Sequence, residues 1–226
     1  MTTITVWADI RCPWCWMGHR QLSSALERLA QSGAPTVHVD HRSFLLEPSG
    51  PETSRLTVRE MALGPWGMDE GEWNGRRDRI ESAGRAIGLD IHIDTARAID
   101  SRPAHRLIKL AVSSGIPAQL AWDVVYEAHL SHNVDLEDRT VLAEVGARLG
   151  LTSTAVRVFF ATTERHDEVM ADHRAGVEQG VRAVPTVVAG GRALSGTHDA
   201  EQLSTFISRS LHAQRSDRPS MTTGPA

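Results

Sequence analysis

Strand-like patterning occurs only near the two ends of this 226-residue chain. At the N-terminal end, residues 3 to 9 and 36 to 46 have extended patterns and enclose a helical segment. At the C-terminal end, residues 184 to 189 and 192 to 194 are typical of a hairpin, and a helix follows them. Between these ends, residues 53 to 180 have helical periodicity throughout, which predicts five to seven helices. This order predicts an α/β fold whose sheet is split by a large all-helical insertion.

The same patterns predict the domain boundaries. Residues 1–50 and 181–213 are predicted to form one discontinuous domain, and residues 51–180 form the helical insertion. Residues 214–226 are polar with little to bury, so we expect a disordered tail there. Because the sheet is split, groups from opposite ends of the chain can become neighbours.

Composition excludes two classes of partner. The chain has 24 basic and 28 acidic residues, a formal charge of −4, and no basic run of the kind that follows a phosphate backbone. No apolar stretch reaches the roughly 18 residues that a membrane helix needs. The first residues carry neither the basic patch nor the long apolar run of a secretory signal. We therefore expect a soluble, cytoplasmic protein that binds neither nucleic acid nor membrane.

The two cysteines of the chain lie three positions apart, where the first strand gives way to a helix. Pro13 suits the first helical position, since its missing N–H has no partner to lose there. Cys12 then occupies the N-cap, while Cys15 lies seven residues, about two turns, before Leu22 on the apolar stripe. Unpaired N–H groups at a helix start stabilise a thiolate. The pattern predicts that Cys12 attacks a disulfide and that Cys15 resolves the product.

The residues around the pair leave alternatives open. Cys12, Cys15 and His19 could hold zinc, but they supply three ligands where a structural site needs four, so we predict no metal. His19 is either a cation near the thiolate or an ordinary helix residue, at the rim or partly buried. Asp9 either caps its loop or accepts a proton from Cys15 during resolution.

Aromatic residues near the pair suggest a substrate surface. Trp14, Trp16 and Phe44 could form an apolar collar around the substrate, and Trp66 and Trp73 could belong to a facing lid. The alternative for each tryptophan is an ordinary core position.

Several segments of the chain together carry a resemblance to a known family: Asp9 to Gly18, Phe44, Ala104-His105-Arg106-Leu107, Gly180 to Pro185 and Leu194-Ser195-Gly196. With these segments, residues 3 to about 212 resemble the DsbA-type oxidoreductases of the FrnE-like group. The resemblance implies a thioredoxin-like fold interrupted by a helical domain. It also implies a cis peptide bond before Pro185, which would pack against the cysteines and leave the Val184 backbone free to pair with an extended substrate. The chain departs from the periplasmic members in having Trp14 where they carry histidine, which argues against a strong oxidant.

The motif and the resemblance together predict a thiol–disulfide oxidoreductase that acts on a disulfide or dithiol substrate, either a protein or a small molecule. It would need no cofactor beyond its Cys12–Cys15 disulfide, with glutathione as a candidate co-substrate and a monomer or homodimer as the assembly. A second hypothesis is a glutathione-dependent isomerase or transferase of the kappa-class or 2-hydroxychromene-2-carboxylate isomerase type, although Cys15 has no task in such enzymes. A third is a binding module without catalysis.

Overall fold

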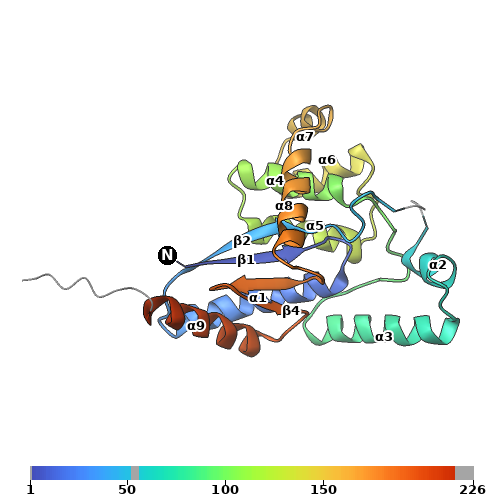
Figure 1. Cartoon of the computed structure of the whole chain (residues 1–226). Coiled ribbons are helices and arrows are strands. Elements are labelled where there is room, and N and C mark those ends of the chain that lie inside the picture. The colour runs from blue at the N-terminus through green and yellow to red at the C-terminus, as the bar shows by residue number, and fades with distance from the viewer. Residues whose placement is uncertain (1, 52–55, 217–226) are drawn as a thin grey trace, which may run out of the picture.

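A computed structural model describes residues 2–51 and 56–216 of the chain (Figure 1). Four strands and nine helices lie within these residues. In chain order the elements are β1 (Thr2–Ala8), α1 (Pro13–Gln31), β2 (Val37–Ser43), α2 (Val58–Leu63), α3 (Glu70–Ala86), α4 (Arg102–Ser113), α5 (Ala118–Leu130), α6 (Arg139–Arg148), α7 (Ser153–Phe160), α8 (His166–Glu178), β3 (Thr186–Ala189), β4 (Arg192–Ser195) and α9 (Ala200–Ser216).

The strands form one mixed sheet in the order β2-β1-β3-β4. β1 pairs with β2 in parallel, with Ile4 opposite Val39. β3 pairs with β1 in the antiparallel sense, with Val6 opposite Val187, and the β3–β4 hairpin completes the edge. The central strand β1 therefore has a neighbour from each end of the chain, as the split-sheet prediction requires.

Helices cover both faces of this sheet, as Figure 1 shows for α1 and α9 on one side and α8 on the other. The face toward α1 and α9 buries alternate β1 residues, Ile4 and Val6, against Leu22 and Ile207. The opposite face buries Trp7 against α8, where Gly176 leaves room for the indole ring. The alternation of β1 thus sets which helix each side chain contacts.

Helix α8 is attached to β2 by a buried carboxylate. Asp172 accepts hydrogen bonds from Lys109 Nζ at 2.6 Å, Arg42 Nη1 at 2.9 Å and the backbone N–H of Ser43 at 3.2 Å. A buried carboxylate is stable only when it is paired in this way. The network fixes the end of the insertion against the sheet.

The start of α1 shares one core with the helical insertion. This cluster joins residues at the end of β1 and the first turns of α1 to buried residues of α3 through α7. The cluster includes both cysteines and their neighbours Ile10, Trp16 and Met17. The insertion therefore forms the wall behind the cysteine pair, and the two predicted domains are packed together rather than separate in their cores.

The described residues place seven helices, α2 to α8, between β2 and β3, at the upper end of the expected number.

The closing helix, α9, is longer than expected. It continues to Ser216 and so includes residues 214–216, which the sequence assigned to a disordered tail. Ala213, Gln214 and Arg215 all have high helix propensity, which explains the extension. The rest of that tail, 217–226, lies outside the described residues.

No helix in the described part of the chain combines the length and the apolar character that crossing a membrane requires.

Candidate active site

The cysteine pair lies where β1 passes into α1. Cys12 is the N-cap residue of α1 and Pro13 occupies the first turn, as the sequence predicted, and that turn contains no acidic residue. Both thiols are free, with 8 % of Cys12 and 1 % of Cys15 exposed. The helix thus presents one sulfur near the surface and covers the other.

The environment of Cys15 favours its protonated form. Burial raises the pKa of the Cys15 thiol well above its ordinary value, and a hydrogen bond and an electrostatic interaction with Cys12 raise it further. The two side chains are therefore within hydrogen-bonding reach of each other. Cys15 is poorly suited to be the first nucleophile but well placed to attack a disulfide formed on Cys12.

The predicted cis proline lies against the same pair. The Val184–Pro185 peptide bond is cis, and the Cys12 thiol donates a hydrogen bond to the Val184 carbonyl oxygen at 3.8 Å. Pro185 also packs on α1 at Gly18, where an added Cβ would lie 2.9 Å from Pro185 Cγ. Segments 172 residues apart in sequence thus meet at Cys12.

Asp9 lies directly behind the pair and is fully buried. Its carboxylate accepts hydrogen bonds from the backbone N–H groups of Leu46 at 2.7 Å and Arg11 at 3.2 Å, and His105 Nε2 lies 3.3 Å from Oδ1. Burial alone would raise the pKa of Asp9, but the interactions with His105 and these N–H groups outweigh it, and the net pKa is lowered. Asp9 is therefore an ionised loop cap that is paired with His105.

His19 differs from one of its predicted roles. It is 4 % exposed, and its Nε2 lies 2.9 Å from the Gln119 carbonyl oxygen, which can only accept a hydrogen bond. Burial lowers the pKa of His19 to about 4, so the ring is neutral near pH 7. It cannot supply a positive charge beside the thiolate. Of the two other places that the sequence allowed, the structure is nearer to the partly buried one than to the rim, although the ring is buried more fully than expected.

A pocket of about 460 Å³ opens beside Cys12. We call it the open pocket. Its lining includes Pro13, Trp14, Trp66 and Trp73, together with several arginines from α3 and the loops around it. Three of the five aromatic residues that the sequence singled out therefore reach the substrate side of Cys12.

The remaining two aromatic residues lie elsewhere. Phe44 packs beside Trp7 and its ring lies 4.9 Å from that of His173, on the α8 face of the sheet, so it does not line the open pocket. It follows β2 directly, where strand alternation directs it away from the cysteines. Trp16 is buried and donates from Nε1 to Asp123 Oδ1 at 2.9 Å. The predicted collar of Trp14, Trp16 and Phe44 thus keeps only Trp14.

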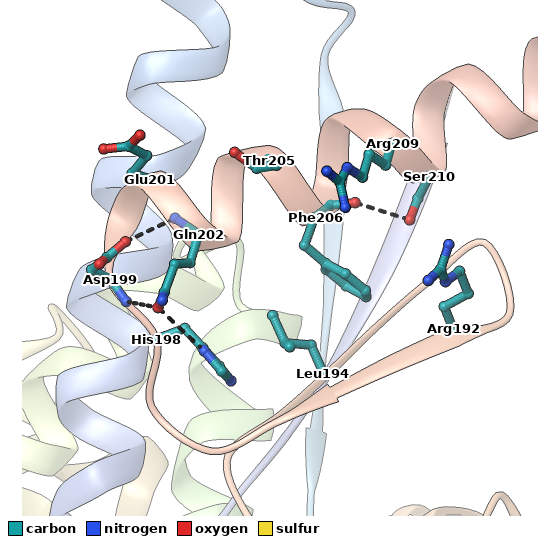
Figure 2. A pocket seen from close by; sticks show the side chains of 10 residues that line it. All are labelled: Arg192, Leu194, His198, Asp199, Glu201, Gln202, Thr205, Phe206, Arg209 and Ser210. Atoms are coloured by element: carbon teal, nitrogen blue, oxygen red, sulfur yellow. Dashed lines mark hydrogen bonds between the residues drawn. The ribbon is translucent and has the colours of Figure 1, made fainter.

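A second pocket, of about 470 Å³, lies between α9 and the β3–β4 hairpin. Figure 2 shows Leu194 and Phe206 pointing into the space between the two elements. The Asp199 and Gln202 side chains cap the start of α9 in a reciprocal way, at 2.8 and 3.3 Å (Figure 2). Neither cysteine lines this pocket, whereas Cys12 lines the open pocket, so the open pocket is the candidate active site.

Two features of the site were not found by sequence reasoning. His105 pairs with Asp9 across 96 residues; it belongs to a segment of the family resemblance and is a polar residue on the apolar face of α4, but neither signal assigned it a role. His129 is buried at the lining of the open pocket, where burial lowers its pKa to about 4. Across residues 2–51 and 56–216, no group of three or more His, Cys, Asp or Glu side chains is arranged to hold a metal ion.

Known structures share this architecture. A probable DsbA oxidoreductase from Streptomyces coelicolor is 25% identical with a TM-score of 0.86, and the match covers 100% of this chain and 95% of that one. The cytosolic disulfide reductase DsbM from Pseudomonas aeruginosa, solved with GSH, has 19% identity, a TM-score of 0.60 and coverages of 93% and 99%. A 2-hydroxychromene-2-carboxylate isomerase has 17% identity, a TM-score of 0.66 and coverages of 96% and 100%. No curated protein matches the chain. The family model of the DSBA-like thioredoxin domain matches residues 3–208, and the chain therefore belongs to that family.

Proposed function

We propose that this protein exchanges disulfides through Cys12 as the nucleophile and Cys15 as the resolving cysteine. The observation that carries the proposal is the contrast between the two thiols on one helix. Cys12 caps α1 and lines a pocket of about 460 Å³, while Cys15 is buried behind it and within reach of it. Membership of a family of disulfide oxidoreductases supports the same chemistry.

In the reductive direction, the Cys12 thiolate attacks one sulfur of a substrate disulfide. The substrate S–S bond breaks, one half leaves as a thiolate, and the other half stays bound to Cys12 as a mixed disulfide. Cys15 then loses its proton and attacks Cys12 Sγ, which releases the second half and forms the Cys12–Cys15 disulfide. Two electrons pass to the substrate, and a thiol reductant such as glutathione must return them. Oxidation of a dithiol substrate reverses these steps.

Backbone groups beside Cys12 are suited to hold the substrate. The Val184 carbonyl faces the Cys12 sulfur, and the cis bond to Pro185 turns this segment toward α1. We expect an extended substrate to pair with Val184 while Trp14 covers its apolar part. Pro13 keeps the first turn of α1 in place.

Resolution requires a proton acceptor for Cys15, and Asp9, which is paired with His105, is a buried carboxylate whose charge acts on the Cys15 thiol. Asp9 is ionised near neutral pH because His105 and two backbone N–H groups stabilise its carboxylate. Asp9→Asn should therefore slow the release of a mixed disulfide several-fold without slowing its formation. Rapid-quench mass spectrometry of the two steps measures this split, and equal slowing of both steps would show a structural role only.

The cysteine variants test the whole proposal. Cys12→Ser should abolish reduction of a model disulfide, by about a thousandfold or more, because no other thiol can start the reaction. Cys15→Ser should keep the first step and accumulate a mixed disulfide on Cys12, detected as added mass. Full turnover in Cys12→Ser would overturn the proposal.

Finer assignments follow from the sequence. We place the protein in the FrnE-like group and in the cytoplasm, with glutathione as co-substrate and a monomer or homodimer as the assembly. The shared fold with a cytosolic disulfide reductase solved with GSH supports the cytoplasmic location and the glutathione co-substrate. Titration of the Cys12–Cys15 couple against glutathione separates a reductase from an oxidase in one experiment.

The second candidate is a glutathione-dependent isomerase, favoured by the shared fold with 2-hydroxychromene-2-carboxylate isomerase. Such an enzyme needs one activating residue at the helix start and no resolving thiol. Cys15, held next to Cys12, therefore counts against it. An isomerase rate that is unchanged in Cys15→Ser would favour this candidate instead.

A further inference from the structure

The open pocket beside Cys12 carries arginines that form no ion pair within the described residues. Arg76 and Arg79 come from one face of α3, and Arg97 comes from the loop before α4. All three are exposed, and none forms an ion pair with another residue of the part of the chain that the structure describes. Neighbouring arginines behave differently, since Arg59 pairs with Glu70 and Arg77 pairs with Asp78.

The other titratable groups of the lining do not cancel this charge. Arg11 forms an ion pair with Glu47, so these two neutralise each other. His129 is neutral near pH 7 because burial lowers its pKa to about 4. The lining therefore has four arginines against one glutamate, a formal excess of three positive charges. The whole chain has a formal charge of −4, so the excess is local to this pocket.

The rest of the lining is apolar, and the space is small. Trp14, Trp66, Val58 and Ile93 contribute hydrophobic surface, and 42 % of Trp66 is exposed. A volume of about 460 Å³ lies in the range of sites for small molecules rather than for a folded protein surface. Arginine binds carboxylates through two parallel hydrogen bonds, so cations beside an apolar wall match an anion with an apolar part.

We propose that the open pocket selects small disulfides and thiols that bear carboxylates, and that Arg76, Arg79 and Arg97 orient them for attack by Cys12. This inference rests on the proposed thiol–disulfide exchange. In the reaction, the Cys12 thiolate forms a bond to one substrate sulfur and the other sulfur leaves as a thiolate. The carboxylates are unchanged and serve only in binding.

Three small aliphatic disulfides of similar size test the charge preference. These are dithiodipropionate with two carboxylates, hydroxyethyl disulfide with no charge, and cystamine with two ammonium groups. Stopped-flow tryptophan fluorescence of the reduced wild-type protein gives the rate of each oxidation. Dividing each rate by that of the same disulfide with dithiothreitol removes differences in intrinsic reactivity. We expect the normalised rate to be highest with dithiodipropionate, intermediate with hydroxyethyl disulfide and lowest with cystamine. The differences between the three rates should become smaller at high salt, because salt screens the charges.

Substitutions identify the residues responsible. The triple variant Arg76→Gln, Arg79→Gln and Arg97→Gln should lose about tenfold or more of the rate with dithiodipropionate and keep the rate with hydroxyethyl disulfide. Arg76→Glu with Arg79→Glu should shift the preference toward cystamine. The matched control is Arg85→Gln, because Arg85 lies on the same helix but outside the pocket, and it should change neither rate. These side chains are exposed, so we expect all variants to fold, and circular dichroism checks this.

The outcomes separate this inference from the proposed function. Equal normalised rates for the three disulfides in the wild type, or an unchanged preference in the triple variant, would overturn the carboxylate assignment while exchange itself persists. Unchanged rates in Cys12→Ser would instead overturn the exchange chemistry. A preference confined to an acidic protein disulfide, with none among the small disulfides, also contradicts the inference.

Discussion

The two sides of the cysteine pair are built in opposite ways. The side of Cys12 opens into a pocket of about 460 Å³ whose lining carries excess positive charge. The side of Cys15 faces a void of about 10 Å³ that is lined by His19, His41, Trp122 and Tyr126. One helix turn therefore separates a sulfur that lines the open pocket from a sulfur that lines only a small void. The difference teaches that packing by the insertion, in addition to position on α1, sets how exposed each thiol is, which supports the roles proposed for them.

At neutral pH, removing one tryptophan from each side gives the largest expected effect. Trp122 is 2 % exposed and its ring contacts those of His41, His105 and Tyr126. Trp122→Ala should lower the free energy of unfolding by about 3–5 kcal/mol and make Cys15 reactive toward iodoacetamide. Urea unfolding and peptide mass spectrometry measure the two changes.

The matched control for that variant lies on the open side. Trp66 is 42 % exposed, so Trp66→Ala should cost less than about 1 kcal/mol and leave Cys15 unreactive. Equal losses of stability from the two variants would remove the contrast between an open and a closed side.

The second prediction is that acid destabilises the packing on the side of Cys15, which we call the closed side. Burial lowers the pKa of His41 to about 3 and that of His19 to about 4, well below the ordinary value near 6.5. The folded state then binds fewer protons than the unfolded state, so their contribution is fully present above about pH 6.5 and is lost as pH falls toward 4. Each of the two should contribute about 1.4 kcal/mol per pH unit in that window.

A variant tests the assignment to His41, whose two ring nitrogens are buried without a hydrogen-bond partner in the described structure. His41→Phe should flatten the decline in stability between pH 6.5 and 4, as followed by urea unfolding at several pH values. The exposed His132 is the control, and His132→Gln should leave the slope unchanged. A wild-type stability that is constant across this range contradicts the account.

The contact between α1 and the cis proline gives the smallest expected effect. A Cβ at Gly18 would lie 2.9 Å from Pro185 Cγ, so Gly18→Ala should cost about 1–3 kcal/mol and slow disulfide exchange by displacing Pro185. On α3, a Cβ at Gly75 would meet nothing within 4 Å, and Gly75→Ala should stabilise the protein by about 0.5–1 kcal/mol. Thermal unfolding of the Gly18→Ala and Gly75→Ala variants compares the two effects. A stabilising effect of Gly18→Ala would contradict a close contact between α1 and Pro185.

Local sequence patterns predicted the features that depend on neighbouring residues. Cys12 and Pro13 were placed at the start of a helix because capping follows local rules, and the buried position of Cys15 follows from helical periodicity. The cis bond before Pro185 came from the family resemblance, since local preference favours trans.

Features that depend on distant contacts were missed or wrong. The pairing of Asp9 with His105 arises only when the insertion folds back on the start of α1. The meeting of Arg97 with α3 depends on the packing of the insertion itself. Phe44 was assigned to an apolar collar around the substrate because it is aromatic and belongs to the family resemblance, but its side chain packs beside Trp7 on the α8 face of the sheet. The charge suggested for His19 is absent because Gln119 and its neighbours bury the ring.

The alkylation rates of the two thiols in the reduced wild-type protein test the central claim most directly. Brief treatment with iodoacetamide, followed by peptide mass spectrometry, measures modification at Cys12 and Cys15 separately. The account predicts that Cys12 is modified at least about tenfold faster, because Cys15 is buried and holds its proton. Equal rates at the two sulfurs, or faster modification of Cys15, would contradict it.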